Sequence, residues 1–181
     1  MAKKPKETVD FLLYLQYFLF PQKQPIMLRI SLIAIGSPQD PWKTLATEYT
    51  KRLAPFAKLA VKEQAGIPFR PNSDKTRVIE EEGNALLRGL PHGAYIVALT
   101  EHGKEMDSLQ FADFLRTHDD SGQELVFLIG GPLGISPEVV THADRTLALS
   151  KLTFTHECAR VLLLEQLYRA ATIIKGKTYH Y

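Results

Sequence analysis

Three features are scarce in this sequence of 181 residues: cysteine, net charge and long apolar segments. The only cysteine, Cys158, excludes an intramolecular disulfide and a cysteine-based metal cluster, and it fits a reducing compartment such as the cytoplasm. The longest apolar run, Phe11 to Phe20, falls well short of the roughly 20 residues that a membrane-spanning helix needs. The formal net charge of +2 does not indicate nucleic-acid binding, so any RNA contact requires local clusters of basic residues.

The first 26 residues differ in character from the rest of the chain. Lys3, Lys4 and Lys6 precede the apolar run, as in a signal peptide, but Glu7 and Asp10 interrupt the basic stretch and no small-residue cleavage site follows. A clear strand pattern begins directly afterwards. We therefore expect residues 1–26 to be an N-terminal extension outside the fold. Residues 27–181 are expected to form a single domain, which is long enough to bury a core.

The domain alternates between short apolar strands and helical segments. Strands are expected at 28–35, 58–64, 93–99, 123–129 and 145–149, and helices at 40–53, from 74 onward, at 107–118, briefly from 136, and at 157–174. Strands separated by helices predict an α/β protein, with a mostly parallel sheet and helices on both faces. In such a sheet, ligands bind at the carboxyl ends of the strands.

Local signals predict where helices begin and which of their faces are exposed. Asp40 followed by Pro41 indicates a capped helix start with proline in its first turn. Asp107 and Gln110 have the spacing of a capping box. The three glutamates at 80–82 are expected to form a solvated face, because adjacent side chains on a helix point in different directions.

The final helix has more apolar positions than one buried face requires. One stripe consists of Val161, Leu164 and Tyr168, and a second of Leu163, Leu167, Ala170 and Ile174. A surface helix needs a single apolar stripe of roughly 100°. We therefore expect this helix to be buried on two sides, against the sheet and against a second subunit.

Three loops leave the predicted strands at their carboxyl ends, at 99–104, 130–134 and 150–155. Glycines after a buried strand let the backbone approach a ligand closely. The spacing of Gly130, Gly131 and Gly134 matches neither a dinucleotide fingerprint nor a phosphate-binding P-loop. A tight turn into a helix explains these glycines equally well.

The C-terminal region holds the remaining side chains of chemical interest. His156 lacks Cys or His partners at metal-ligand spacing, and the sequence contains no Gly-x-Ser-x-Gly nucleophile elbow. His180 is a candidate acid or base near neutral pH, although a terminal histidine is commonly a frayed end. A modest basic cluster suited to phosphate contacts, or simply a solvated surface, consists of Arg160, Arg169, Lys175 and Lys177.

Several ordered blocks resemble one known family, the ribosomal RNA large-subunit methyltransferase H family of the SPOUT class. The resemblance covers residues 27–181 and leaves out residues 1–26. The blocks are Ile30 to Gly36, Leu128 to Gly134, Leu149 to Phe154 with His156, Arg160 with Val161, Glu165 to Ala170, and Tyr179 with His180.

The resemblance implies a fold, a reaction and partners. It implies a homodimer with a C-terminal trefoil knot that binds S-adenosylmethionine, without a metal and without a membrane. It further implies methylation of N3 of pseudouridine 1915 in helix 69 of 23S rRNA, on the assembled 70S ribosome in the cytoplasm. Unknotted connections are the rule in proteins, so the knot comes from the resemblance alone.

The same resemblance assigns roles to individual residues. Cofactor contacts are expected from Leu99, Gly130, Leu149, Ser150, Lys151, Leu152, Thr153 and Phe154. Apolar Leu99, Leu152 and Phe154 are suited to hold an adenine between them. His180, Arg169 and Tyr179 are expected at the reacting base, and Arg160, Lys175 and Lys177 on the RNA.

Two departures from the family pattern and two alternative functions remain. Thr155 stands where the family usually has proline, and we expect it to cap the final helix instead. Tyr181 follows His180 where relatives commonly carry a charged residue. The same fold and cofactor also fit a methyltransferase acting on another RNA, such as transfer RNA. A ribosome-binding factor without catalytic activity is the other alternative.

Overall fold

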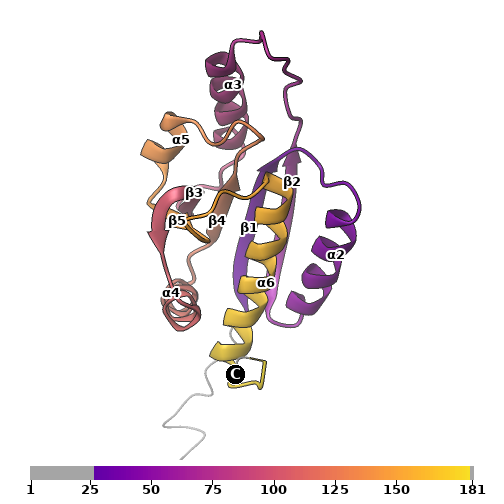
Figure 1. Ribbon diagram of the computed structural model, residues 1–181. Helices are drawn as coiled ribbons and strands as arrows, with labels where there is room; N and C mark the ends of the chain where they lie inside the picture. Colours follow the sequence, from indigo (N-terminus) through magenta and orange to yellow (C-terminus); the bar gives the residue numbers. More distant parts are fainter. Residues whose placement is uncertain (1–26, 180–181) are drawn as a thin grey trace, which may run out of the picture.

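The computed structural model describes residues 27–179, which form one sheet with helices on both faces (Figure 1). The five strands are β1 (Leu28–Ile35), β2 (Ala57–Gln64), β3 (Tyr95–Glu105), β4 (Leu125–Ile129) and β5 (Arg145–Ala148). The helices are α2 (Trp42–Leu53), α3 (Lys75–Leu87), α4 (Ser108–Asp120), α5 (Pro137–His142) and α6 (His156–Ile174). The predicted N-terminal extension, residues 1–26, and the candidate base His180 lie outside the described residues.

The sheet order is β2-β1-β4-β3-β5, and every strand pair is parallel. This arrangement confirms the predicted α/β class. The central strand β4 is fully buried, as its continuous apolar sequence predicts. At one edge, β2 exposes most of its residues, including Lys58, Val61 and Lys62. The trefoil knot remains a prediction.

Alternate side chains of the strands face two separate cores. On one face of the sheet, residues such as Ile30 and Leu32 of β1 pack against α2, α4 and α6. On the other face, Ile33 and Ile35 pack with Leu86 of α3 and Val139 of α5. The period of two along the strands therefore explains why helices cover both faces of the sheet.

Helix α6 lies over the sheet between α2 and α4 (Figure 1). Both apolar stripes are largely covered within the chain, because Val161, Leu164, Leu163, Leu167 and Ala170 are all buried by the sheet and these two helices. The wide apolar surface of α6 is thus explained without a second subunit. The expectation that a partner covers the second stripe finds no support in this packing.

Most predicted helix starts are confirmed. The Asp107 carboxylate and the Gln110 side chain form a reciprocal capping box at the start of α4. The Thr155 hydroxyl accepts a hydrogen bond from the Cys158 N–H at the start of α6, as expected. The prediction for Asp40 is wrong, since α2 begins at Trp42 without a side-chain cap. The Asp40 carboxylate instead accepts a hydrogen bond from the Thr44 hydroxyl.

Strand β3 is longer than its apolar run predicts. It continues through residues 100–105, for which the sequence predicts a loop, and resumes pairing with β5 after an irregularity between Leu99 and Lys104. Gly103 makes this second contact possible, because a Cβ there would lie 2.5 Å from the Leu147 carbonyl carbon. The polar residues of this segment therefore extend the sheet beyond its buried part.

Candidate functional site

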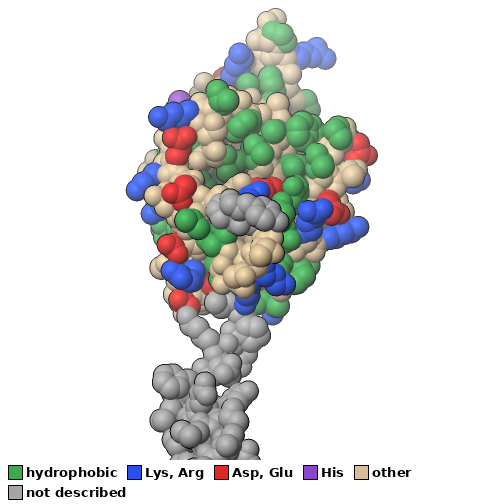
Figure 2. All heavy atoms as spheres, turned by 60° about the horizontal axis from the view of Figure 1, so that its bottom comes forward, with side chains coloured by type: hydrophobic (Ala, Val, Ile, Leu, Met, Phe, Trp, Pro, Cys, Tyr) green, Lys and Arg blue, Asp and Glu red, His purple; other side chains and the backbone are tan. Residues whose placement is uncertain are grey.

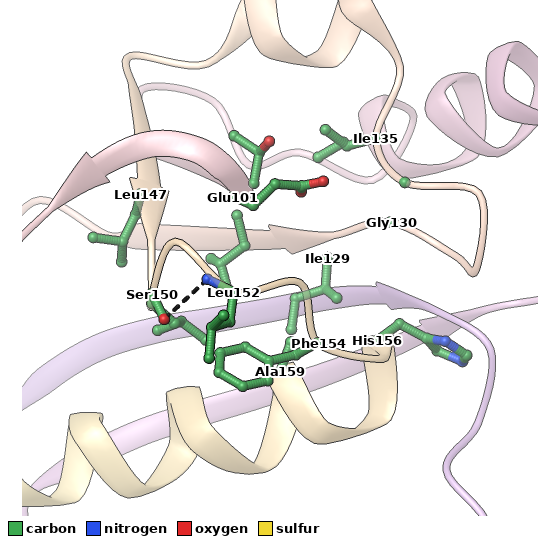
Figure 3. A pocket seen from close by; sticks show the side chains of 14 residues that line it. Glu101, Ile129, Gly130, Ile135, Leu147, Ser150, Leu152, Phe154, His156 and Ala159 are labelled. Carbon is green, nitrogen blue, oxygen red and sulfur yellow. Dashed lines mark hydrogen bonds between the residues drawn. The ribbon is translucent and has the colours of Figure 1, made fainter.

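A cavity opens at the carboxyl edge of the sheet, where the chain leaves β3, β4 and β5 (Figure 3). The cavity borders the three segments that the sequence predicts as loops, although residues 99–101 belong to β3. The lining residues come from all three and from the first turn of α6: Leu99, Thr100, Glu101, Ile129, Gly130, Gly134, Ile135, Leu147, Leu149, Ser150, Leu152, Phe154, His156 and Ala159.

The loop after β5 supplies an apolar wall that stays partly open to solvent. Leu152 is 71% exposed and Phe154 is 36% exposed, which is unusual for large apolar side chains that border a cavity. The Leu152 N–H donates a hydrogen bond of 3.1 Å to the Ser150 hydroxyl, so this turn has a defined shape (Figure 3). The wall is suited to contact a flat apolar group.

The opposite wall is a glycine turn after β4. A Cβ on Gly130 would lie 2.2 Å from the Gly134 carbonyl oxygen, so a side chain at position 130 does not fit. Gly134 has a φ of +95°, a conformation that other residues rarely adopt. The turn therefore needs glycine for its own tight geometry, and this places the backbone of Gly130 and Gly134 at the cavity. A turn that only connects β4 to α5 explains the same glycines.

The structure brings six of the eight expected cofactor residues to this cavity, namely Leu99, Gly130, Leu149, Ser150, Leu152 and Phe154. Lys151 and Thr153 do not line it. The Lys151 side chain is 85% exposed and points to Glu105, at 3.9 Å.

Sequence reasoning missed three polar residues at the cavity, Thr100, Glu101 and His156. Glu101 is the only carboxylate among the lining residues, and its position directly after the apolar part of β3 was the available signal. His156 begins α6, and its ring lies near the end of β1, where a Cβ on Gly36 would be 3.5 Å from Nε2. His156 belongs to one of the blocks that carry the family resemblance, whereas no sequence motif marks Glu101.

A buried carboxylate supports the glycine turn from behind. Glu82 of α3 is 3% exposed, so the expectation of a solvated face at 80–82 is wrong for this residue. Its Oε1 accepts a hydrogen bond of 3.0 Å from the Ile67 N–H, and its Oε2 has no hydrogen-bond partner among the described residues. A Cβ on Gly131 would lie 2.6 Å from Oε2. Glu82 faces inward because α3 packs this side against the turn and α5.

Arg160 holds the start of α6 to the ends of β1 and β2. Its side chain is 3% exposed, and it donates to the Glu63 carboxylate at 2.6 Å and to the Gly36 carbonyl oxygen at 2.7 Å. The Ser37 hydroxyl donates to the other oxygen of Glu63. The guanidinium therefore serves an internal ion pair, and the RNA contact expected of Arg160 finds no support in its position.

Arg169 and Tyr179 meet at the other end of α6, together with Glu165. The Arg169 guanidinium donates to Glu165 Oε1 and lies over the Tyr179 ring, 4.8 Å from its centroid. The Tyr179 hydroxyl donates to the same carboxylate oxygen at 3.3 Å. Glu165 was not predicted, although its spacing of four residues from Arg169 is typical of a helical ion pair.

The surroundings of this cluster change the pKa values of its members. The hydrogen bond to Glu165 raises the pKa of Arg169 above its ordinary value. Burial, followed by a hydrogen bond with Tyr49, raises the pKa of Tyr179. Arg169 therefore stays cationic and Tyr179 stays neutral at physiological pH.

The two expected RNA-binding lysines lie at the same end of α6 as this cluster. Lys175 follows the last helical residue, and the Lys177 ammonium lies 4.9 Å from the centroid of the Phe56 ring. The cavity borders His156 and Ala159, in the first turn of the same helix. Arg169 lies ten residues after Ala159, which is about 15 Å along the helix axis, and no member of the cluster lines the cavity of its own chain.

Residues 27–179 contain no group of three His, Cys, Asp or Glu side chains placed to hold a metal ion. Within the same range, every helix is too short or too polar to cross a membrane.

The chain is similar to known methyltransferases over most of its length. The model of a family described as "Predicted SPOUT methyltransferase" matches residues 28–180. A "Ribosomal RNA large subunit methyltransferase H" from Trichlorobacter lovleyi is 42% identical, over 85% of this chain and 100% of that protein. A protein of the same name from Gloeobacter violaceus is 40% identical, over 85% of this chain and 99% of that protein.

A solved structure shares the fold at much lower sequence identity. It is described as "Probable Methyltransferase from Bordetella pertussis Tohama I", and it is 16% identical to this chain with a TM-score of 0.51. The match covers 80% of this chain and 95% of the other.

Proposed function

Because the chain belongs to the SPOUT methyltransferases, in the ribosomal RNA large subunit methyltransferase H family, we propose that it methylates N3 of a pseudouridine in helix 69 of 23S rRNA. The target is position 1915 in the standard rRNA numbering, and the substrate is the assembled ribosome in the cytoplasm. The observation that carries this proposal is the cavity at the carboxyl edge, which combines a glycine turn with a partly open apolar wall.

Methyltransferases of the SPOUT class use S-adenosylmethionine, and the residues around the cavity fit this cofactor. Leu99, Leu152 and Phe154 are placed to hold the adenine, and the backbone of the Gly130 turn to satisfy its polar edge. Glu101 is an acceptor within reach of hydroxyl or ammonium groups in the cavity. When bound, the cofactor supplies a methyl group already activated by its positive sulfur, so no metal is required.

The remaining task of the protein is to position the base and to accept the N3 proton. His180 is our candidate for the proton acceptor, because histidine titrates near neutral pH. Arg169 and Tyr179, held by Glu165, lie before it in the chain and are suited to orient the nucleotide or its phosphates. An always-charged guanidinium beside a neutral phenol can bind an anion without competing for the proton.

Arg169 and Tyr179 do not line the cavity of their own chain, and Arg169 lies about 15 Å beyond Ala159 along α6. We therefore infer a homodimer in which the C-terminal cluster of one subunit completes the cavity of the other. Leu152 and Phe154 leave exposed apolar surface at the cavity mouth. On the side of the molecule that carries α6, hydrophobic side chains gather between charged ones (Figure 2). Both observations support an interface that includes the cavity mouth and the neighbouring surface on the α6 side.

The experiment that tests the reaction is mass spectrometry of rRNA fragments, after incubation of the protein with S-adenosylmethionine and ribosomes that lack the modification. We expect one methyl group on the helix 69 fragment. His180→Ala should lower the turnover rate about 100-fold or more, with cofactor affinity unchanged. Full methylation by this variant at saturating cofactor would remove the proposed role of His180.

The choice of substrate has its own test. The net charge of +2 gives weak nonspecific attraction to RNA, so recognition should depend on the folded surface of the ribosome. We expect strong activity on ribosomes and little on free 23S rRNA, and equal rates on both would contradict this. Methylation of transfer RNA instead would favour a methyltransferase of the same fold and cofactor that acts on another RNA. Calorimetry that detects no S-adenosylmethionine binding would favour the ribosome-binding factor without catalysis.

A further inference from the structure

The connection from β2 to α3 projects from the carboxyl edge of the sheet, beyond the body of the molecule (Figure 1). We call residues 67–77, which include the first turn of α3, the arm. Its tip is a closed turn, because the Ser73 N–H donates to the Arg70 carbonyl oxygen and the Ser73 hydroxyl accepts from the Arg70 N–H. Pro68 and Pro71 restrict the backbone on either side. The arm therefore presents its side chains in a defined arrangement.

The exposed side chains of the arm are basic and aromatic. Phe69 is 37% exposed, and Arg70 and Lys75 are also exposed. Within residues 27–179, neither of these two cations forms an ion pair, whereas Arg77 is paired with Glu81. Three cations and the single carboxylate of Asp74 give the arm a net charge of +2, although Arg77 is neutralised by Glu81. Arg70 and Lys75 are therefore the cations that the arm offers to a partner.

The base of the arm is joined to the cofactor cavity through Glu82. This carboxylate accepts the hydrogen bond from Ile67, the first residue of the arm, and its second oxygen lies against Gly131 in the glycine turn. The next residue, Gly83, packs against Ser136 at the end of the same loop, where a Cβ would lie 2.2 Å from the hydroxyl oxygen. The arm and the cavity wall thus share one rigid support.

We propose that the arm is an RNA-binding element, with Phe69 stacked on an unpaired base and Arg70 and Lys75 on phosphates near the target nucleotide. Sequence-specific RNA recognition relies on aromatic stacking of unpaired bases, and cations beside the ring hold the backbone. This inference rests on the proposed function and adds a contact surface to it. The arm is separate from Lys175 and Lys177, which follow the end of α6 that is remote from the cavity.

Binding of ribosomes by the full-length protein tests the arm directly. The double variant Arg70→Ala/Lys75→Ala should bind more weakly than wild type and depend less on salt. Its plot of log affinity against log salt should lose about 0.7 to 0.9 of slope for each phosphate contact removed. Phe69→Ala should lower the affinity about tenfold and leave the salt slope unchanged, because stacking releases no counterions.

A matched pair of variants controls for the loss of charge. Lys43→Ala/Lys51→Ala removes two exposed lysines from α2 and should leave both the affinity and the salt slope as in wild type. Calorimetry should show unchanged S-adenosylmethionine affinity for every variant. Wild-type binding by Arg70→Ala/Lys75→Ala, or an equal loss in the α2 pair, would overturn the proposal. Binding of the protein to ribosomes is measured without methyl transfer. Failure of the arm proposal is therefore distinguishable from failure of the proposed reaction.

Discussion

The Arg169 guanidinium lies 4.8 Å from the centroid of the Tyr179 ring, towards the end of α6 that is remote from the cavity at the carboxyl edge. Glu165 fixes both side chains, since it accepts hydrogen bonds from each of them. The cluster is therefore organised before any substrate binds. Its distance from the cavity makes the pairing of two chains testable by mixing variants.

We expect two inactive variants to restore activity to each other. Gly130→Ala disrupts the cavity of its own chain, because the new Cβ meets the Gly134 carbonyl, and Arg169→Ala removes the guanidinium of the cluster. After subunit exchange, mixed dimers hold one complete site, so methylation should return to about a quarter of wild type. The control is each variant mixed with itself. No recovery in the mixture, with exchange verified, would contradict a site shared between two subunits.

Phe154→Ala should weaken S-adenosylmethionine binding about tenfold, or about 1.4 kcal/mol, because it removes a large part of the apolar wall. The stability of the fold should change little, since the ring is 36% exposed. Lys151→Ala is the matched control from the same loop, because its side chain points away from the cavity. Calorimetry measures both, and equal affinities for the two variants would rule out the proposed adenine wall.

Glu82→Ala should lower the free energy of unfolding by about 1–3 kcal/mol, because the partly buried Ile67 N–H loses its acceptor. Glu82→Gln keeps an acceptor for that N–H and removes a buried charge, so its stability should equal or exceed that of wild type. Exposed Glu80→Ala is the control and should change stability by less than about 0.5 kcal/mol. Urea unfolding measures all three. An unfolding midpoint shared by the two alanine variants would show that Glu82 is dispensable.

Tyr179 should ionise at higher pH than an ordinary tyrosine, since burial and the hydrogen bond with Tyr49 raise its pKa. A raised folded-state pKa stabilises the fold below the unfolded value of about 10, and this contribution is lost as the pH rises through the folded value. Tyr179→Phe should therefore lose less stability than wild type above a pH of about 10. Tyrosinate absorbance measures the ionisation of Tyr179, and urea unfolding measures the stability. Identical stability profiles against pH for wild type and Tyr179→Phe would argue against the raised pKa of Tyr179.

Features decided by neighbouring residues were predictable from the sequence. The caps at Asp107 and Thr155 involve partners within three positions, so short patterns identify them. The predicted strand ends and the segments that follow them likewise identified most of the cavity. Asp40 shows the limit of such patterns. Its carboxylate accepts a hydrogen bond from the Thr44 hydroxyl and none from the backbone N–H groups at the start of α2.

Features decided by distant contacts were not predictable in the same way. Glu82 pairs with a residue 15 positions away and Arg160 with one 97 positions away. A charged side chain is usually exposed, so nothing local marks these two as buried. The apolar stripes of α6 correctly predict burial on two sides, but their spacing does not reveal whether the cover is another helix of the chain or a partner.

The exposed edge strand β2 has a consequence for solubility. An outer strand with unpaired backbone groups offers a template for the strand of another molecule, which leads to aggregation. Lys58 and Lys62 place charge along this edge, and strand β5 at the opposite edge has only four residues. Both borders of the sheet thus discourage intermolecular strand pairing, which leaves the surfaces outside the sheet edges for the proposed dimer contact.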